Sequence, residues 1–114
     1  MLNWKIMINQ EELLQLRNAY IEIGKIVQKY GCGEYDSTLT LLMDQVNCID
    51  SQDNDENKLR YLVESYQPIF TSRGALGDFI VYVKDDELRC RLNEEYSNNL
   101  EKIWTILKRY ILLK

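Results

Sequence analysis

The sequence predicts a mainly α-helical domain, a bundle of four or five helices with one irregular insert. Apolar residues recur at spacings of three and four over several long stretches, as in helices that bury one face. The 114 residues include only one proline and five glycines, so few residues interrupt long elements. Hydrophobic residues make up 46% of the chain and charged residues 28%, as is typical of an ordinary globular protein. A single domain over residues 1–114 suits this length.

The first helix is expected from about Gln10 to Tyr30. Its apolar stripe consists of Leu13, Leu16, Tyr20, Ile23, Val27 and Tyr30. Asn9 stands where an N-cap is needed and Glu12 follows three residues later, which resembles a capping box. Gly31 occupies the position at which a left-handed residue often ends a helix.

Two more helices are expected before the proline. The second begins at Asp36 or Ser37, ends near Ile49 and buries Leu39, Leu42, Met43, Val46 and Ile49. The segment 50–57, DSQDNDEN, contains no apolar residue and is predicted to be a loop. The third helix follows it, with Leu59, Leu62, Val63 and Tyr66 facing inward. Pro68 is expected to end this helix because proline lacks a backbone N–H.

The helical pattern is lost between residues 68 and 78, where Gly74 and Gly77 indicate turns. The following segment, Phe79–Val83, has the sequence FIVYV and is short and β-prone. Either it lies across the helices in an extended conformation or it forms a short strand with Trp4–Ile8. The aromatic residues around this insert are expected to pack in the core: Tyr61, Tyr66, Phe70 and Tyr82.

The remaining chain is predicted to form two helices. Asp85 or Asp86 is expected to cap a short helix that continues through Leu92, and Asn93 to cap the last one. The last helix has Tyr96, Leu100, Ile103, Trp104, Leu107 and Ile111 on one face. Further apolar residues widen that face: Ile106, Tyr110, Leu112 and Leu113. This helix is therefore either central to the bundle or part of a surface for self-association.

The composition argues against an enzyme and a cofactor. The chain has no histidine, which removes the commonest general base and the usual zinc and iron ligands. Cys32, Cys48 and Cys90 form an odd set without C-x-x-C spacing, which indicates reduced thiols and a cytoplasmic protein. Cys48 and Cys90 are expected in the core. Because no apolar stretch approaches the roughly 20 residues of a membrane span and no cleavage site follows the first residues, neither a membrane helix nor a signal peptide is expected.

The charge distribution is the most informative feature. Residues 1–57 have a net charge of −6 and residues 58–114 a net charge of +2, and no basic residue lies between Lys29 and Lys58. The acidic stretch supplies the candidate partner-binding residues: Glu34, Tyr35, Asp36, Asp44, Asp50, Asp53, Asp55 and Glu56. Either these carboxylates only keep the protein soluble, or they dock a basic protein. Tyr35 either joins that interface or fastens a loop to the bundle. Nucleic acid is not an expected partner, because the basic residues are interspersed with acids.

Two smaller patterns have structural explanations. Asp53, Asp55, Asn57 and Glu64 fall at positions 1, 3, 5 and 12 of a calcium-loop template. Lys58 stands where that template needs glycine, so we attribute these residues to a helix cap and expect no bound metal. Arg73 and Asp78 are expected to pair and close the insert.

The stretch from Ser72 to Trp104 contains S-R-G-A-L-G-D-F, then an acidic turn, R-L-N-E and a late I-W. It resembles a block in short, uncharacterised bacterial proteins, from whose S-R-G-G-L-S-D-F form it departs at Ala75 and Gly77. This resemblance implies a shared fold. By size, acidity and lack of catalytic residues, the chain also resembles immunity proteins of bacterial toxin–immunity pairs, including contact-dependent growth inhibition systems. That likeness implies a small cytoplasmic protein that neutralises one toxin domain, often a basic nuclease.

We therefore expect an immunity or inhibitor protein whose acidic residues cover the positive cleft of a toxin, without turnover and without contact with a membrane. The alternative is a helical adaptor or regulator that forms a homodimer through its C-terminal helix.

Overall fold

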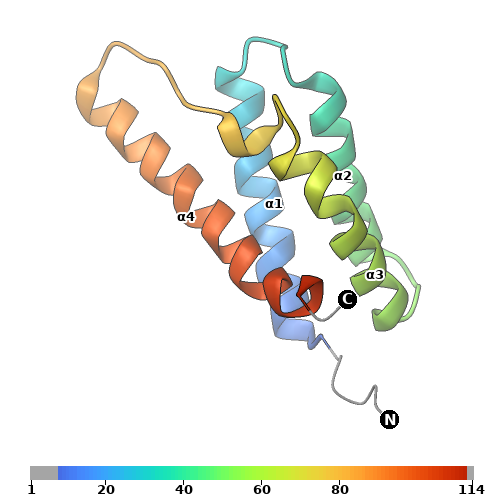
Figure 1. Cartoon of the computed structure of the whole chain (residues 1–114). Coiled ribbons are helices and arrows are strands. Elements are labelled where there is room, and N and C mark those ends of the chain that lie inside the picture. Colours follow the sequence, from blue (N-terminus) through green and yellow to red (C-terminus); the bar gives the residue numbers. More distant parts are fainter. Residues whose placement is uncertain (1–7, 113–114) are drawn as a thin grey trace.

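The computed structural model describes residues 8–112, which form four α-helices and two short helical turns and contain no strand (Figure 1). The elements are α1 (Gln10–Tyr30), α2 (Asp36–Asp50), α3 (Asp55–Tyr66), the π-helical turn η2 (Gln67–Thr71), the 3-10 turn η3 (Leu76–Asp78) and α4 (Asp86–Ile111). The predicted all-α bundle with one irregular insert is therefore confirmed. No helix among these residues is long and apolar enough to cross a membrane.

Helix α1 lies between α4 on one side and α2 on the other, and α3 packs beside α2 (Figure 1). The core therefore forms around α1, where Leu16 and Ile23 are fully buried together with Leu62 of α3 and Leu107 of α4. The insert lies over the end of the bundle at which α1 turns into α2 (Figure 1). Burial of these apolar side chains is the main source of stability, since the helices contain little alanine to favour them intrinsically.

Local signals set the ends of α1 as predicted, with one correction. The capping box is formed: the Glu12 backbone N–H donates to Asn9 Oδ1 at 2.7 Å and the Asn9 N–H to Glu12 Oε1 at 3.3 Å. Gly31 is not left-handed (φ −89°); the left-handed residues are Cys32 (φ 54°) and Gly33 (φ 78°). Glycine is needed at position 31 for a different reason, because an added Cβ would lie 2.5 Å from the Val27 carbonyl oxygen.

Helix α2 has the predicted extent, but α3 begins at Asp55 because Asn54 caps it, so the predicted loop 50–57 is reduced to residues 51–54. Two further details differ. Met43 is 59% exposed, so its predicted burial was wrong; Gln45 lies in the core instead, at 1% exposure. α3 ends at Tyr66, but the chain continues past Pro68 as the π-helical turn, which closes when the Ser72 N–H donates to the Gln67 carbonyl. Proline is tolerated there because the first N–H groups of a helical turn need no internal acceptor.

The C-terminal part is one continuous helix, so the prediction of two helices separated at Asn93 was wrong. Asp85 caps α4, accepting from the Leu88 N–H at 3.0 Å. Asn93 lies inside the helix and binds the insert: its Oδ1 accepts from the Val81 N–H at 2.8 Å and its Nδ2 donates to the Val81 carbonyl at 3.2 Å. The sequence suggested a cap because asparagine favours caps, but here the side chain satisfies the backbone of a distant segment.

The segment Phe79–Val83 is extended and is not part of a sheet among the described residues. Phe79 contacts Tyr35, which follows the C-terminal end of α1 (ring centroids 5.3 Å apart). Ile8 lies before the N-terminal end of α1, and 21 helical residues separate the two ends by about 31 Å. The predicted pairing of Trp4–Ile8 with this segment is therefore wrong at Ile8; residues 4–7 lie outside the described residues.

The wide apolar face of the C-terminal helix is buried mainly against α1, and its use for self-association stays a prediction. Ile106 and Tyr110 are each 7% exposed and therefore belong to the core. Arg109 pairs with Glu12, which ties the end of α4 to the start of α1. Leu112 is exposed at the end of the helix, and Leu113 lies outside the described residues.

Candidate functional site

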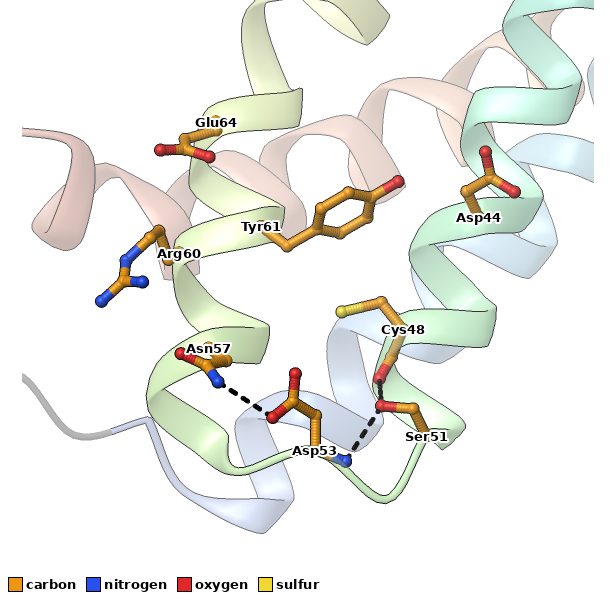
Figure 2. Close-up of a pocket in the computed structure, with 8 residues that line it drawn as sticks. All are labelled: Asp44, Cys48, Ser51, Asp53, Asn57, Arg60, Tyr61 and Glu64. Carbon is orange, nitrogen blue, oxygen red and sulfur yellow. Dashed lines mark hydrogen bonds between the residues drawn. The ribbon is translucent and has the colours of Figure 1, made fainter.

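A hollow of about 500 Å³ lies between α2 and α3 (Figure 2). It is lined by Asp44, Cys48, Ser51, Asp53, Asn57, Arg60, Tyr61 and Glu64. The residues of α3 reach it because spacings of three and four place Asn57, Tyr61 and Glu64 on one side of the helix, away from buried Leu59 and Leu62. Asp44 and Cys48 face them from α2, one helical turn apart.

Local hydrogen bonds hold the loop at the floor of the hollow. Ser51 Oγ donates to the Cys48 carbonyl at 2.7 Å and accepts from the Asp53 N–H at 3.3 Å. Asp53 Oδ1 accepts from the Asn54 N–H at 2.8 Å and from Asn57 Nδ2 at 3.0 Å. Figure 2 draws the bond between Asn57 and Asp53 and both bonds of Ser51. Asn54 caps α3 by accepting from the Asn57 N–H. Two residues of the calcium-loop template, Asp53 and Asn57, are thus held by hydrogen bonds around the Asn54 cap. Among residues 8–112 there is no group of three acidic or cysteine side chains placed to hold a metal ion.

The carboxylates of the hollow differ in the hydrogen bonds and ion pairs that they form within the protein. The Asn57 side chain and then the Asn54 N–H hold the pKa of Asp53 below its usual value, so Asp53 is ionised at neutral pH. Asp44 and Glu64 form no hydrogen bond or ion pair with any residue that the structure describes. These two carboxylates are therefore available to an external cation. The Tyr61 ring lies across the hollow with its hydroxyl directed toward α2 (Figure 2).

The basic residues near the hollow do not neutralise it. Lys58 is only 9% exposed, and its Nζ donates to the Ile49 carbonyl at 2.8 Å, at the C-terminal end of α2. Arg60 is exposed and points away from α2 (Figure 2). The segment 36–66, which contains both helices, has seven carboxylates and these two basic residues, a net charge of −5.

The structure divides the predicted partner-binding residues into separate groups. Asp44 and Asp53 line the hollow, and Asp50, Asp55 and Glu56 lie at the same end of the α2–α3 pair. The residues Glu34, Tyr35 and Asp36 lie at the other end of α2, whose 15 residues span about 22 Å.

Three further members of the predicted set are already engaged within the protein. Asp50 accepts two hydrogen bonds from Arg17 of α1, at 2.7 and 3.0 Å, and this guanidinium lowers the pKa of Asp50. The acidic stretch therefore has a counter-charge from outside its own sequence. Tyr35 is half-buried with its ring edge-on to Phe79 at 5.3 Å, so it fastens the insert to the bundle. Asp55 accepts from Gln10 Nε2 at 3.0 Å.

Several predictions about other side chains were wrong. Tyr61 and Tyr82 are 40% and 82% exposed, whereas both were expected in the core; Phe70 is buried as expected. Cys90 is exposed, and Cys48 is half-buried at the hollow, where burial raises the pKa of its thiol. The expected pair between Arg73 and Asp78 is not formed: both are exposed and neither has an ion pair with any described residue.

Chemically, the hollow combines carboxylates with an exposed aromatic ring, the surroundings that a lysine or arginine side chain prefers. Six residues of its lining were not among the predicted partner-binding residues: Cys48, Ser51, Asn57, Arg60, Tyr61 and Glu64. For Asn57, Tyr61 and Glu64, the signal available in the sequence was their spacing of four and three, which places them on the side of α3 away from Leu59 and Leu62. The chain matches no known protein-family model, and searches of the curated proteins and of the solved structures also found no match.

Proposed function

We propose that this chain is a cytoplasmic immunity-type inhibitor that binds one basic protein through the α2–α3 face, defined as the residues lining the hollow together with Leu41. The observation that carries the proposal is the pair of unengaged carboxylates, Asp44 and Glu64, on either side of the exposed Tyr61 ring. A cation entering between them replaces water around charges that have no internal partner.

Exposed apolar groups on the same face support binding of a protein in particular. Leu41 is 39% exposed and lies three residues before Asp44, on the same side of α2. Tyr61 is 40% exposed. Interfaces obtain most of their binding energy from a few such anchors, with tyrosine and arginine enriched among them. The face therefore offers both an anchor and the charge that selects a basic partner.

The proposed mechanism is occlusion. The net charge of −5 over residues 36–66 attracts a basic surface and accelerates its association, an effect that salt screens. Once seated, the helix pair covers the basic surface sterically, and no bond is made or broken. The resemblance in size and acidity to immunity proteins supports a toxin, such as a nuclease with a positive substrate cleft, as the partner.

The experiment that tests this function is co-expression with the product of the adjacent upstream reading frame, with a tag on one of the two proteins only. We expect a one-to-one complex that weakens as salt is raised, and a neighbour that is toxic when expressed alone. A harmless neighbour that does not copurify would contradict the immunity function.

A pair of matched variants tests the face itself. In the complex, Asp44→Asn combined with Glu64→Gln should weaken binding by about tenfold or more and reduce its salt dependence. Glu34→Gln combined with Asp36→Asn changes the net charge equally at the other end of α2 and should leave affinity nearly unchanged. If the second pair has the larger effect, the interface lies at the α1–α2 turn and our assignment is refuted.

A further inference from the structure

The segment Phe79–Val83 has the properties of an unpaired edge strand. Its side chains alternate between buried and exposed, as in a strand that covers a core: Phe79 and Val81 are 7% and 0% exposed, whereas Ile80 and Tyr82 are 52% and 82% exposed. All five residues are of the β-branched or aromatic types that favour extended structure. The described chain contains no second strand with which it could pair.

The backbone N–H and carbonyl groups are hydrogen-bonded along one edge of this segment and are without partners along the other. The Asn93 side chain binds both the N–H and the carbonyl of Val81, so these groups face α4. In an extended chain, the backbone groups of successive residues point to opposite edges. The N–H and carbonyl groups of Ile80 and Tyr82 therefore point away from α4, and none of them has a hydrogen-bond partner among the residues that the structure describes. Figure 1 shows the chain between η3 and α4 running along the outer edge of the molecule.

We propose that this edge pairs with the same segment of a second copy, as an antiparallel two-stranded ribbon centred on Val81. In that register Ile80 lies opposite Tyr82 of the second copy, and each such pair exchanges two backbone hydrogen bonds. The unsatisfied groups of one copy thus meet the unsatisfied groups of the other. A register shifted by one residue would place Ile80 or Tyr82 opposite Val81, whose N–H and carbonyl face α4 and are already bound by Asn93.

The flanking charges favour the same register. Asp78 ends η3 directly before the extended segment and Lys84 directly follows it, so the central pairing brings each Asp78 to the end of the ribbon at which Lys84 of the second copy lies. Both are exposed, and neither forms an ion pair with a described residue. On the exposed face, each Ile80 lies beside a Tyr82, a cross-strand pair of a kind that stabilises sheets. The edge is thus self-complementary in hydrogen bonding, shape and charge, and this dimer does not involve the α2–α3 face.

The test measures the monomer–dimer equilibrium of the full chain by sedimentation over a range of concentrations. Lys84→Asp places like charges at both ends of the ribbon and should weaken dimerisation by about tenfold, or 1.4 kcal/mol. The double variant Asp78→Lys with Lys84→Asp restores the opposite pairing and should restore the dimer. Lys102→Asp, an exposed lysine on α4, is the matched control and should have no such effect.

Amide hydrogen exchange locates the contact. At low concentration the Val81 N–H should be protected by Asn93, while the Ile80 and Tyr82 N–H groups exchange freely; at high concentration all three should be protected. Tyr82→Pro removes an outward N–H and should prevent this change without loss of helical circular dichroism. A chain that stays monomeric at about millimolar concentration, or a dimer that the charge swap does not restore, would overturn the proposal.

Discussion

The substitution Lys58→Met tests how the acidic pair of helices tolerates a buried cation. Lys58 is 9% exposed, and its Nζ donates to the Ile49 carbonyl, one of the last acceptors of α2. Methionine retains most of the apolar stem, so the change removes mainly the charge and its hydrogen bond.

The structure sets the expected magnitude. A hydrogen bond from a charged donor contributes about 1.5–3 kcal/mol, and a cation at a helix C-terminus about 0.3–1 kcal/mol. These contributions overlap at Lys58, since one ammonium group makes both, and the loss also leaves the Ile49 carbonyl unsatisfied. We therefore expect a loss of about 2–3 kcal/mol in the free energy of unfolding. For a domain of this size the melting temperature should fall by roughly 10 °C.

Urea and thermal unfolding followed by circular dichroism measure this change. Arg60→Met is the matched control, because it removes the same charge two residues away from an exposed side chain that forms no ion pair with a described residue. It should change stability by less than about 0.5 kcal/mol. If Lys58→Met destabilises the protein no more than Arg60→Met does, the buried ammonium does not stabilise the end of α2 and our reasoning fails.

Two further perturbations test the insert and the pairing of α1 with α2. Gly77→Ala should destabilise the protein by about 1–3 kcal/mol in urea unfolding, because the added Cβ would lie 2.2 Å from the Phe70 carbonyl oxygen. Gly24→Ala is the control and should be neutral or stabilising, because the nearest atom is 3.4 Å from its added Cβ. Equal effects of the two substitutions would contradict the close approach at Gly77. Arg17→Gln should raise the pKa of Asp50 measured by NMR, because the guanidinium holds it below its ordinary value. Since that pKa is lower in the folded state, the pairing stabilises the protein above about pH 4 and the contribution is lost as pH falls through the folded pKa. The wild type and Arg17→Gln should therefore converge in stability in acid, and a difference that persists when the carboxylate is protonated would refute the pairing.

The helices were predictable because their signals are local. The spacing of Leu13, Leu16 and Tyr20 requires a helix wherever its apolar side can be covered, and Asn9 with Glu12 marks where that helix begins. The acidic character of the α2–α3 pair was equally visible, since it depends on charges that are close in the sequence. Asp44 and Asp53, the two carboxylates of the hollow that were predicted, were identified because they belong to this acidic stretch.

Other features depended on contacts between distant residues. The split of the acidic residues into two groups follows from the length of α2, and Arg17 neutralises Asp50 from 33 residues away. Asn93 is compatible with a cap and with a helix interior, and the choice was made by its bonds to Val81, 12 residues earlier.

The sequence by itself therefore determined the helical class, the approximate extents of the first two helices and the acidity of one region. Periodicity and capping act over only a few residues, so they are complete in the local sequence. Only the tertiary structure decided that Asp44 and Glu64 share a hollow, that Lys58 is buried beneath it, and that Ile80 and Tyr82 form an open edge. Each of these depends on which backbone and side-chain groups find a partner after the helices pack, and that outcome is not contained in any single segment.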